Sequence, residues 1–199
     1  MKRMISGCAI LVFLALLNPT SPVSAAEPRA AMDTLKIGDE APSFVMRNLA
    51  TGDVVYLRDY VGKTLRNPWI KKERQVTVLS FWATWCQPCK TEIPILTKLA
   101  GQFTNQPVKF FLVNTLEKGD QTEDSVLATC RARGYTLTCL IDPAERYALK
   151  YSVRGLPVLV VIDKFGIVRK INHGYHENFQ IELEKVLKDL MKEDETVKK

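Results

Sequence analysis

Apolar residues along the chain form short continuous runs that alternate with segments of helical spacing. The runs are rich in β-branched residues, which is typical of strands buried inside a sheet, and they occupy residues 76–82, 108–113, 137–141 and 157–162. Other segments carry apolar side chains three and four positions apart, which predicts helices over residues 90–103, 123–133, 143–151 and 177–191. Strands alternating with helices predict an α/β domain, with a mixed central sheet flanked by helices on both faces.

Further short apolar segments predict two hairpins and a loop. Residues 44–46 and 54–57 flank a turn that contains glycine, and residues 167–171 follow the last buried run after a second turn. Residues 63–75 are mostly polar and include Trp69, so we expect a loop insertion there. This loop is interpreted as a surface elaboration, with contact to a substrate as the alternative.

The beginning of the chain has the pattern of a targeting segment. Lys2 and Arg3 precede an apolar run at residues 8–17, which is shorter than the roughly 20 residues that a membrane-spanning helix needs. Small residues at 23–26 then offer a cleavage site. We expect secretion to the periplasm, and an uncleaved membrane anchor is the alternative. The expected organisation is a signal peptide over 1–26, a flexible lead-in over 27–36, one folded domain over 37–191 and a charged tail over 192–199.

Composition and charge narrow the class of protein. Hydrophobic residues make up 46% and charged residues 25% of the chain, which is globular composition. The 28 Lys and Arg residues exceed the 22 Asp and Glu residues, giving a formal net charge of +6. Many of these charges lie in mixed-sign clusters such as residues 71–74, which suits a solvated surface better than a nucleic-acid interface. We therefore expect no nucleic-acid partner.

The sequence Trp85-Cys86-Gln87-Pro88-Cys89 follows a predicted buried strand and begins a predicted helix. Two cysteines three positions apart on a first helical turn can bring their sulfurs within bonding reach. The unpaired N–H groups and the dipole of a helix N-terminus stabilise a thiolate, and a proline is tolerated there. We expect Cys86 to be an exposed, attacking thiolate with a lowered pKa, and Cys89 to be the resolving thiol.

Structural interpretations compete with this redox chemistry. The Cys86–Cys89 pair could be an inert surface disulfide. A zinc site would need a second pair of ligands, and Cys130 and Cys139 are nine residues apart and expected in the core, so we expect no metal. The histidines of the NHGYH segment at residues 172–176 are interpreted as polar surface residues.

The chain resembles the thioredoxin superfamily, and within it the TlpA/ResA-like periplasmic thiol–disulfide oxidoreductases of the redoxin group. The resemblance covers residues 36–190 and is carried by GDEAPSF at 38–44, YVGK at 60–63, FWATWC at 81–86, EIP at 92–94 and GLP at 155–157. It implies a thioredoxin fold with an added N-terminal β-hairpin, and a cis peptide at Leu156-Pro157 that faces the cysteines.

The resemblance also implies how the protein works. Disulfide-bearing protein substrates would contact Trp85, Gln87 and Pro88 and the backbone of Leu156 beside Pro157. A membrane thiol donor would regenerate the reduced cysteine pair. The protein would need no cofactor and would be a monomer. The reducing direction is implied, including the reduction of oxidised apocytochrome c cysteines to thiols before haem attachment.

Two positions depart from acidic residues found in relatives. Cytoplasmic thioredoxins have an acidic residue on the strand beneath the cysteines, where this chain has Ser80, and some reducing members have Glu between the cysteines, where it has Gln87. Glu92 is the nearby carboxylate. We expect it to face solvent or to cap the helix, and tuning of the thiols is the alternative.

Cys130 and Cys139 are assigned to the inner face of a helix and to the following strand. Buried cysteine behaves as a small hydrophobic residue, so one interpretation is two packed thiols. Because the expected compartment is oxidising and Gly134 turns the chain back, a structural disulfide between them is the other interpretation.

Two other functions remain as alternatives. A peroxiredoxin-like peroxidase would share the hairpin region, but its chemistry needs Thr three residues before the reactive cysteine, where this chain has Ala83. A copper-delivering metallochaperone on the same fold would pair two cysteines with a distant histidine. Here the cysteines are separated by two residues rather than three, and the histidines lie near the end of the last hairpin.

Overall fold

A computed structural model describes residues 34–66 and 73–193 of the chain. The predicted signal peptide, most of the lead-in, Trp69 and all but the first two residues of the tail lie outside these ranges. Within the two ranges, none of the helices combines the length and the hydrophobicity needed to cross a bilayer.

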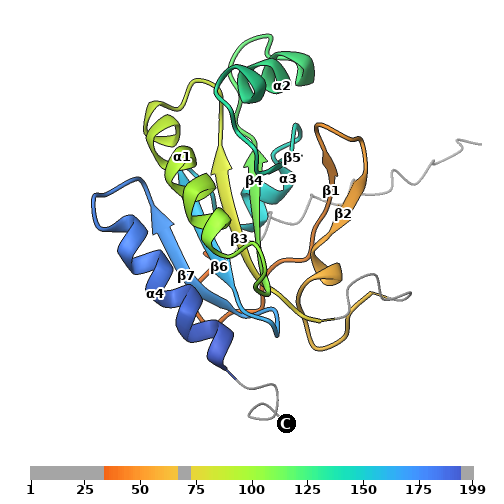
Figure 1. The fold of residues 1–199 in the computed structure, drawn as a ribbon. Coiled ribbons are helices and arrows are strands. Elements are labelled where there is room, and N and C mark those ends of the chain that lie inside the picture. Colours follow the sequence, from red (N-terminus) through yellow and green to blue (C-terminus); the bar gives the residue numbers. More distant parts are fainter. Residues whose placement is uncertain (1–33, 67–72, 194–199) are drawn as a thin grey trace, which may run out of the picture. The chain divides into compact units, whose positions relative to one another are not determined.

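The centre of the fold is a seven-stranded sheet with the order β2-β1-β5-β4-β3-β6-β7 (Figure 1). Strands β3, β4 and β5 run parallel, whereas β6 is antiparallel to β3, and β7 to β6. The hairpin β1–β2 extends the opposite edge, with β1 antiparallel to β5. The strands span β1 Val45–Asn48, β2 Val54–Tyr56, β3 Val76–Trp82, β4 Val108–Asn114, β5 Thr138–Ile141, β6 Val158–Ile162 and β7 Val168–His173.

Within the described part of the chain, four α-helices flank this sheet: α1 Gln87–Gln102, α2 Glu123–Ala132, α3 Arg146–Lys150 and α4 Phe179–Lys192; a 3-10 turn, η1, spans Leu57–Asp59. Apolar residues of α1, α2 and α4 pack in one core on one face of the sheet, and α3 belongs to a second core on the other face. The predicted α/β domain with a mixed sheet, helices on both faces and an N-terminal hairpin is therefore confirmed.

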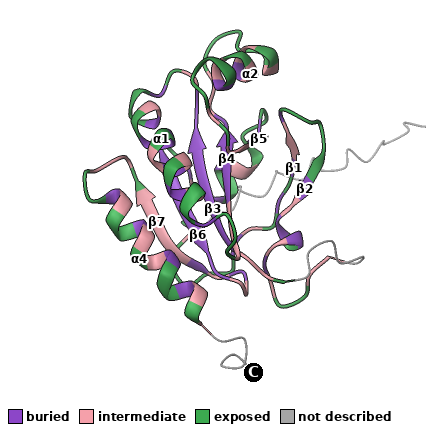
Figure 2. Ribbon diagram, viewed as in Figure 1, coloured by how far each residue is buried: buried purple, intermediate pink, exposed green. Residues whose placement is uncertain are grey.

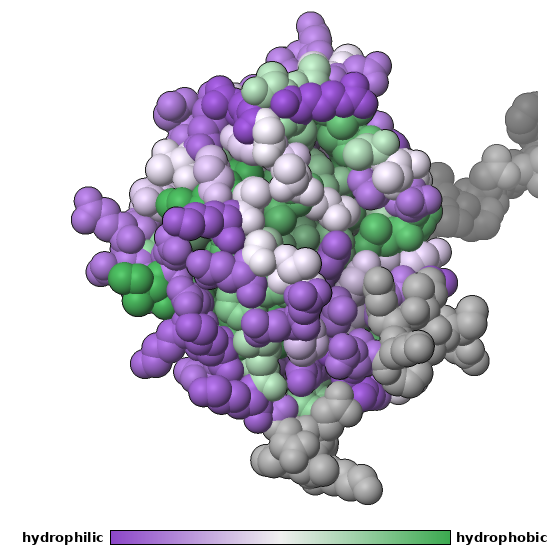
Figure 3. All heavy atoms as spheres, in the orientation of Figure 1, coloured by the Kyte–Doolittle hydropathy of each residue, from purple (hydrophilic) through white to green (hydrophobic). Residues whose placement is uncertain are grey.

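The alternation of side chains along the strands separates the two cores. In β3, Val78 and Trp82 face the core with α1 and α4, whereas Leu79 and Phe81 face the core with α3. The central strands are buried along nearly their whole length (Figure 2), as the continuous apolar runs predict. On the surface, polar side chains dominate the viewed face and apolar atoms appear in small separate patches (Figure 3).

One predicted helix is shorter than expected. The sequence predicts a helix over 143–151, but α3 begins only at Arg146. Asp142 accepts hydrogen bonds from the backbone N–H groups of Tyr147 and Ala148, and Glu145 adopts a left-handed conformation with φ of 54°. These contacts hold residues 142–145 in a turn, which apolar spacing alone does not reveal.

Candidate active site

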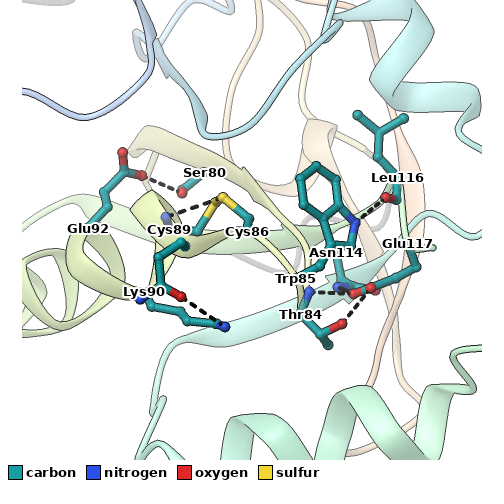
Figure 4. The surroundings of a disulfide bond; sticks show 11 residues. Ser80, Thr84, Trp85, Cys86, Cys89, Lys90, Glu92, Asn114, Leu116 and Glu117 are labelled. Carbon is teal, nitrogen blue, oxygen red and sulfur yellow. Dashed lines mark hydrogen bonds between the residues drawn. A yellow bond between two sulfur atoms is a disulfide. The ribbon is translucent and has the colours of Figure 1, made fainter.

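The cysteine pair lies where β3 ends and α1 begins. The carbonyl of Trp82, the last residue of β3, accepts a hydrogen bond from Thr115 N–H. The backbone N–H of Cys86 donates a hydrogen bond to the carbonyl of Ala83. Cys86 caps α1, and its Sγ is bonded to that of Cys89 in a disulfide (Figure 4). The predicted junction of buried strand and helix is confirmed, and the structure shows the pair in its oxidised form.

The first turn of α1 directs its backbone toward the sulfur of Cys86. Cys89 N–H lies 3.2 Å from Cys86 Sγ and donates to it. Pro88 stands in the first turn, where the absence of an N–H leaves no intrahelical bond broken. After reduction, the same N–H and the helix dipole favour negative charge on Cys86.

The exposure expected for Cys86 is wrong for the oxidised form. Cys86 is 1% exposed, as is Cys89, because the disulfide holds both sulfurs against the helix within the hydrophobic core. The accessible part of the motif is formed by its neighbours: Trp85 is 39% exposed, and Gln87 and Pro88 are also exposed. A partner that approaches the disulfide therefore meets these three side chains first.

Beneath the pair, Glu92 and Ser80 form a buried polar contact. Ser80 on β3 is fully buried, and its Oγ donates a 2.7 Å hydrogen bond to Glu92 Oε1 (Figure 4). Glu92 is 1% exposed, and its second oxygen, Oε2, has no hydrogen-bond partner. The expectation that Glu92 faces solvent or caps the helix is therefore wrong. It follows Cys89 by three positions, which places both on one face of α1.

Burial changes the acidity of this carboxyl group. Removal from water raises the pKa of Glu92 to about 7, and the hydrogen bond from Ser80 acts in the opposite direction. A carboxyl group with a pKa near neutrality can both accept and release a proton under ordinary conditions.

A second carboxylate, Glu117, holds the loop before Cys86, and the sequence analysis missed it. Glu117 Oε1 accepts hydrogen bonds from Thr84 N–H at 2.8 Å and Asn114 Nδ2 at 2.7 Å, and Oε2 accepts from Thr84 Oγ1 at 2.6 Å. The pattern that could have revealed it is Asn-Thr-Leu-Glu, which begins at Asn114, the last residue of β4. Since β3 and β4 are parallel, residues after both strands meet at one edge of the sheet.

The same loop fixes Trp85. The indole Nε1 of Trp85 donates a 2.7 Å hydrogen bond to the carbonyl of Leu116, whose φ of 56° is left-handed. Lys118 Nζ lies 4.0 Å from the centre of the indole ring, which is a cation–π contact. The hydrogen bond to Leu116 (Figure 4) holds the edge of the ring and Lys118 contacts one face, although Trp85 is partly exposed to solvent.

The segment before β6 reaches the same edge of the sheet. Leu156-Pro157 is a cis peptide bond, as the resemblance implies. Phe81 pairs with Val158 across the antiparallel β3 and β6, so Pro157 stands opposite the end of β3, where the cysteine loop starts. Leu156 packs against the core that contains both cysteines. A groove of about 430 Å³ borders Arg154, Leu156, Pro157 and His173.

The remaining predicted residues lie elsewhere. Cys130 and Cys139 are buried, and in this structure they are not bonded to one another. His173 ends β7, and His176 contacts Asn172 in the turn that follows. Among residues 34–66 and 73–193, three or more metal-ligating side chains do not gather at any point.

Comparison with known proteins agrees with this geometry. Residues 37–171 match the AhpC/TSA family. The chain is 31% identical over 174 residues to the thiol-disulfide oxidoreductase ResA of Geobacillus kaustophilus, covering 87% of this chain and 88% of the relative. It is 33% identical over 138 residues to ResA of Geobacillus thermodenitrificans, covering 69% and 70%.

Solved structures share the fold. A Chlorobium tepidum protein assigned as thiol:disulfide interchange protein DsbE superimposes with a TM-score of 0.66 at 25% identity, covering 79% of this chain and 99% of that one. The exposed lipoprotein thioredoxin Etrx1 of Streptococcus pneumoniae gives a TM-score of 0.59 at 27% identity, covering 75% and 100%. The thioredoxin fold is therefore confirmed.

Proposed function

Because the chain belongs to the AhpC/TSA family and is a ResA-like thiol–disulfide oxidoreductase, we propose that it reduces protein disulfides outside the cytoplasm through Cys86 and Cys89. The observation that carries this proposal is the disulfide at the N-terminus of α1, where Cys89 N–H donates to Cys86 Sγ. This arrangement stabilises a thiolate on Cys86 once the pair is reduced.

The reaction proceeds by two thiol–disulfide exchanges. The Cys86 thiolate attacks one sulfur of a substrate disulfide, which forms a mixed disulfide and releases the other substrate sulfur as a thiolate. Cys89 then loses its proton and attacks Cys86 Sγ, which releases the first substrate sulfur. The substrate gains two electrons and ends as a dithiol, and the protein ends with the Cys86–Cys89 disulfide.

Glu92 is the proton acceptor we assign to the second exchange. Cys89 is buried, so its thiol proton needs a nearby base before the sulfur can attack. Glu92 lies on the same face of α1, its Oε2 has no hydrogen-bond partner, and its pKa is raised to about 7 by burial. Ser80 is a positioning residue, since its hydroxyl donates to the other oxygen of Glu92.

Substrate chains bind, in this proposal, along the edge that carries both segments of the site. Trp85, Gln87 and Pro88 present accessible side chains beside the disulfide. The backbone of Leu156, next to Pro157, is available to pair with an extended substrate segment, which is a common mode of peptide recognition. The groove beside Pro157 lies next to this backbone.

The reducing direction rests on the similarity to ResA-like proteins, and the location rests on the sequence. The basic, apolar and small-residue segments at the start of the chain support secretion to the periplasm. There a membrane thiol donor would restore the reduced pair after each turnover. The disulfide of oxidised apocytochrome c is one substrate that this role includes.

Variants of the two cysteines test the proposal directly. The reduced wild-type protein should reduce insulin disulfides, and Cys86→Ser should abolish this activity. Cys89→Ser should accumulate a mixed disulfide between Cys86 and a substrate peptide, detected by mass spectrometry. Normal turnover by Cys89→Ser would overturn the assignment of roles.

Two control assays separate the other functions. A peroxidase would consume hydrogen peroxide in proportion to enzyme, and a metallochaperone would bind Cu(I) without reducing insulin. Activity in either assay, with no insulin reduction by the wild-type protein, would overturn the proposal.

A further inference from the structure

Outside the active site, the structure brings two further thiols together. Cys130 lies near the end of α2 and Cys139 on β5, and each is 6% exposed. The two thiols are neighbours in this core, since each shifts the pKa of the other. Both belong to the core that also contains Cys86 and Cys89, so the two thiol pairs share one face of the sheet.

The connection between α2 and β5 explains why these thiols meet. After α2 the chain reverses at Gly134, whose φ of 66° is left-handed and suits glycine. Its N–H donates to the carbonyl of Arg131, and Tyr135 N–H donates to the carbonyl of Cys130 at 2.9 Å. The chain then enters β5 at Thr138. This short, hydrogen-bonded reversal fixes the end of the helix over the strand.

The two thiols are unequal. The neighbouring thiol of Cys139 lowers the pKa of Cys130, whereas the neighbouring thiol of Cys130 and burial both raise the pKa of Cys139. Cys130 is therefore the thiol that ionises first and the one suited to attack a disulfide.

We propose that Cys130 and Cys139 are a second oxidation site of this protein, which a small-molecule disulfide such as oxidised glutathione closes to a disulfide. The Cys130 thiolate attacks one glutathione sulfur, forms a mixed disulfide and releases one glutathione thiolate. Cys139, as its thiolate, then attacks Cys130 Sγ and releases the second glutathione. The two cysteines lose two electrons in total, and the released glutathiones take up the electrons and the two thiol protons.

A disulfide between Cys130 and Cys139 would link α2 covalently to β5 in the central sheet. Val126 and Cys130 are the buried residues of α2, so the helix has few apolar contacts that hold it in place. Cys139 shares this core with Trp82, the last residue of β3, and Tyr135 packs edge-on against the Trp82 indole with ring centroids 5.6 Å apart. The second pair thus adjoins the strand that leads to the active-site loop.

Trypsin separates the two thiol pairs for mass spectrometry. Cleavage places Cys86 and Cys89 in one peptide, residues 75–90, whereas Cys130 and Cys139 fall in two peptides, residues 119–131 and 134–146. The native protein is first reduced, then incubated with oxidised glutathione, alkylated with iodoacetamide and digested without reductant. We expect peptides 119–131 and 134–146 to appear joined by a disulfide.

The proposal would be overturned if peptides 119–131 and 134–146 were recovered separately and alkylated, while peptide 75–90 carried its internal disulfide. The double variant Cys86→Ser, Cys89→Ser should still form the link, which keeps this test independent of the proposed function. Cys130→Ser and Cys139→Val should each abolish it. The decisive measurement uses the wild-type protein, so it stands even if a variant fails to fold.

Discussion

Burial destabilises the charged form of Glu92 and brings its pKa close to neutrality. A carboxylate that is 1% exposed loses most of its hydration, and its charged form is compensated by the single hydrogen bond from Ser80. The raised pKa of about 7 follows from this imbalance. A group that changes charge near neutrality beneath a buried thiol is suited to moving that thiol's proton.

The titration of Glu92 makes folding stability depend on pH. The folded carboxyl keeps its proton up to about pH 7, whereas in the unfolded chain it loses the proton near the ordinary glutamate pKa of about 4.5. The stabilisation from binding that proton is complete below pH 4.5 and is lost as pH rises to about 7. We expect the oxidised wild type to lose on the order of 3 kcal/mol of unfolding free energy from this group over that range.

Glu92→Gln isolates that contribution, because glutamine cannot titrate. Urea unfolding of both oxidised proteins at several pH values should show that the wild type becomes less stable relative to the variant between pH 4.5 and pH 7. A constant difference across this range would mean that Glu92 has an ordinary pKa in the folded protein. Slower resolution of mixed disulfides by Glu92→Gln would additionally support its role as proton acceptor.

At the scale of elements, the loop between β4 and α2 supports the loop between β3 and α1. Three hydrogen bonds end on the Glu117 carboxylate, two of them from Thr84, and Trp85 is tied to Leu116. Two strand ends that meet at one sheet edge thus position the cysteine motif together. The active-site geometry depends on a segment about thirty residues away in sequence, as the separation of 33 between Thr84 and Glu117 shows.

Removal of this carboxylate should loosen the cysteine loop. Glu117→Ala leaves Thr84 N–H and the Asn114 amide without their acceptor, which should cost about 2 kcal/mol of unfolding free energy. Glu117→Gln keeps one acceptor oxygen and should lose less. The NMR signal of the Trp85 indole N–H should shift in Glu117→Ala.

Glu184→Ala is the matched control for this prediction. Glu184 pairs with Lys188 on the exposed side of α4, and such a pair contributes less than about 1 kcal/mol. If Glu117→Ala and Glu184→Ala have equal effects on stability and neither moves the Trp85 signal, Glu117 does not support the site.

At the scale of the whole molecule, two cores on the faces of one sheet stabilise the fold. Leu112 on β4 is fully buried in the core that contains the cysteines, whereas Ile181 on α4 is 72% exposed. Leu112→Ala should cost about 2–5 kcal/mol of unfolding free energy in denaturant titrations. Ile181→Ala should change it by less than about 0.5 kcal/mol, and similar losses in both variants would contradict the burial pattern.

The sequence was sufficient for the sheet and for the cysteine pair because both depend on local patterns. Continuous apolar runs mark buried strands, and two cysteines beside a proline at a strand–helix junction mark the site. Glu92 was misjudged because a charged residue is ordinarily placed at the surface, and only the packing of α1 on β3 shows its burial. Glu117 was missed because its partners are distant in sequence, and the short α3 depends on contacts to Asp142.

The central claim is that reduced Cys86 ionises more readily than Cys89, and alkylation of the reduced protein tests it most directly. The rate of iodoacetamide modification, measured against pH and assigned by mass spectrometry, should be faster for Cys86. Its rate should be half-maximal below the ordinary thiol pKa of about 8.5. Equal, slow rates for both cysteines with midpoints near 8.5 would contradict the account and leave the pair as a structural disulfide.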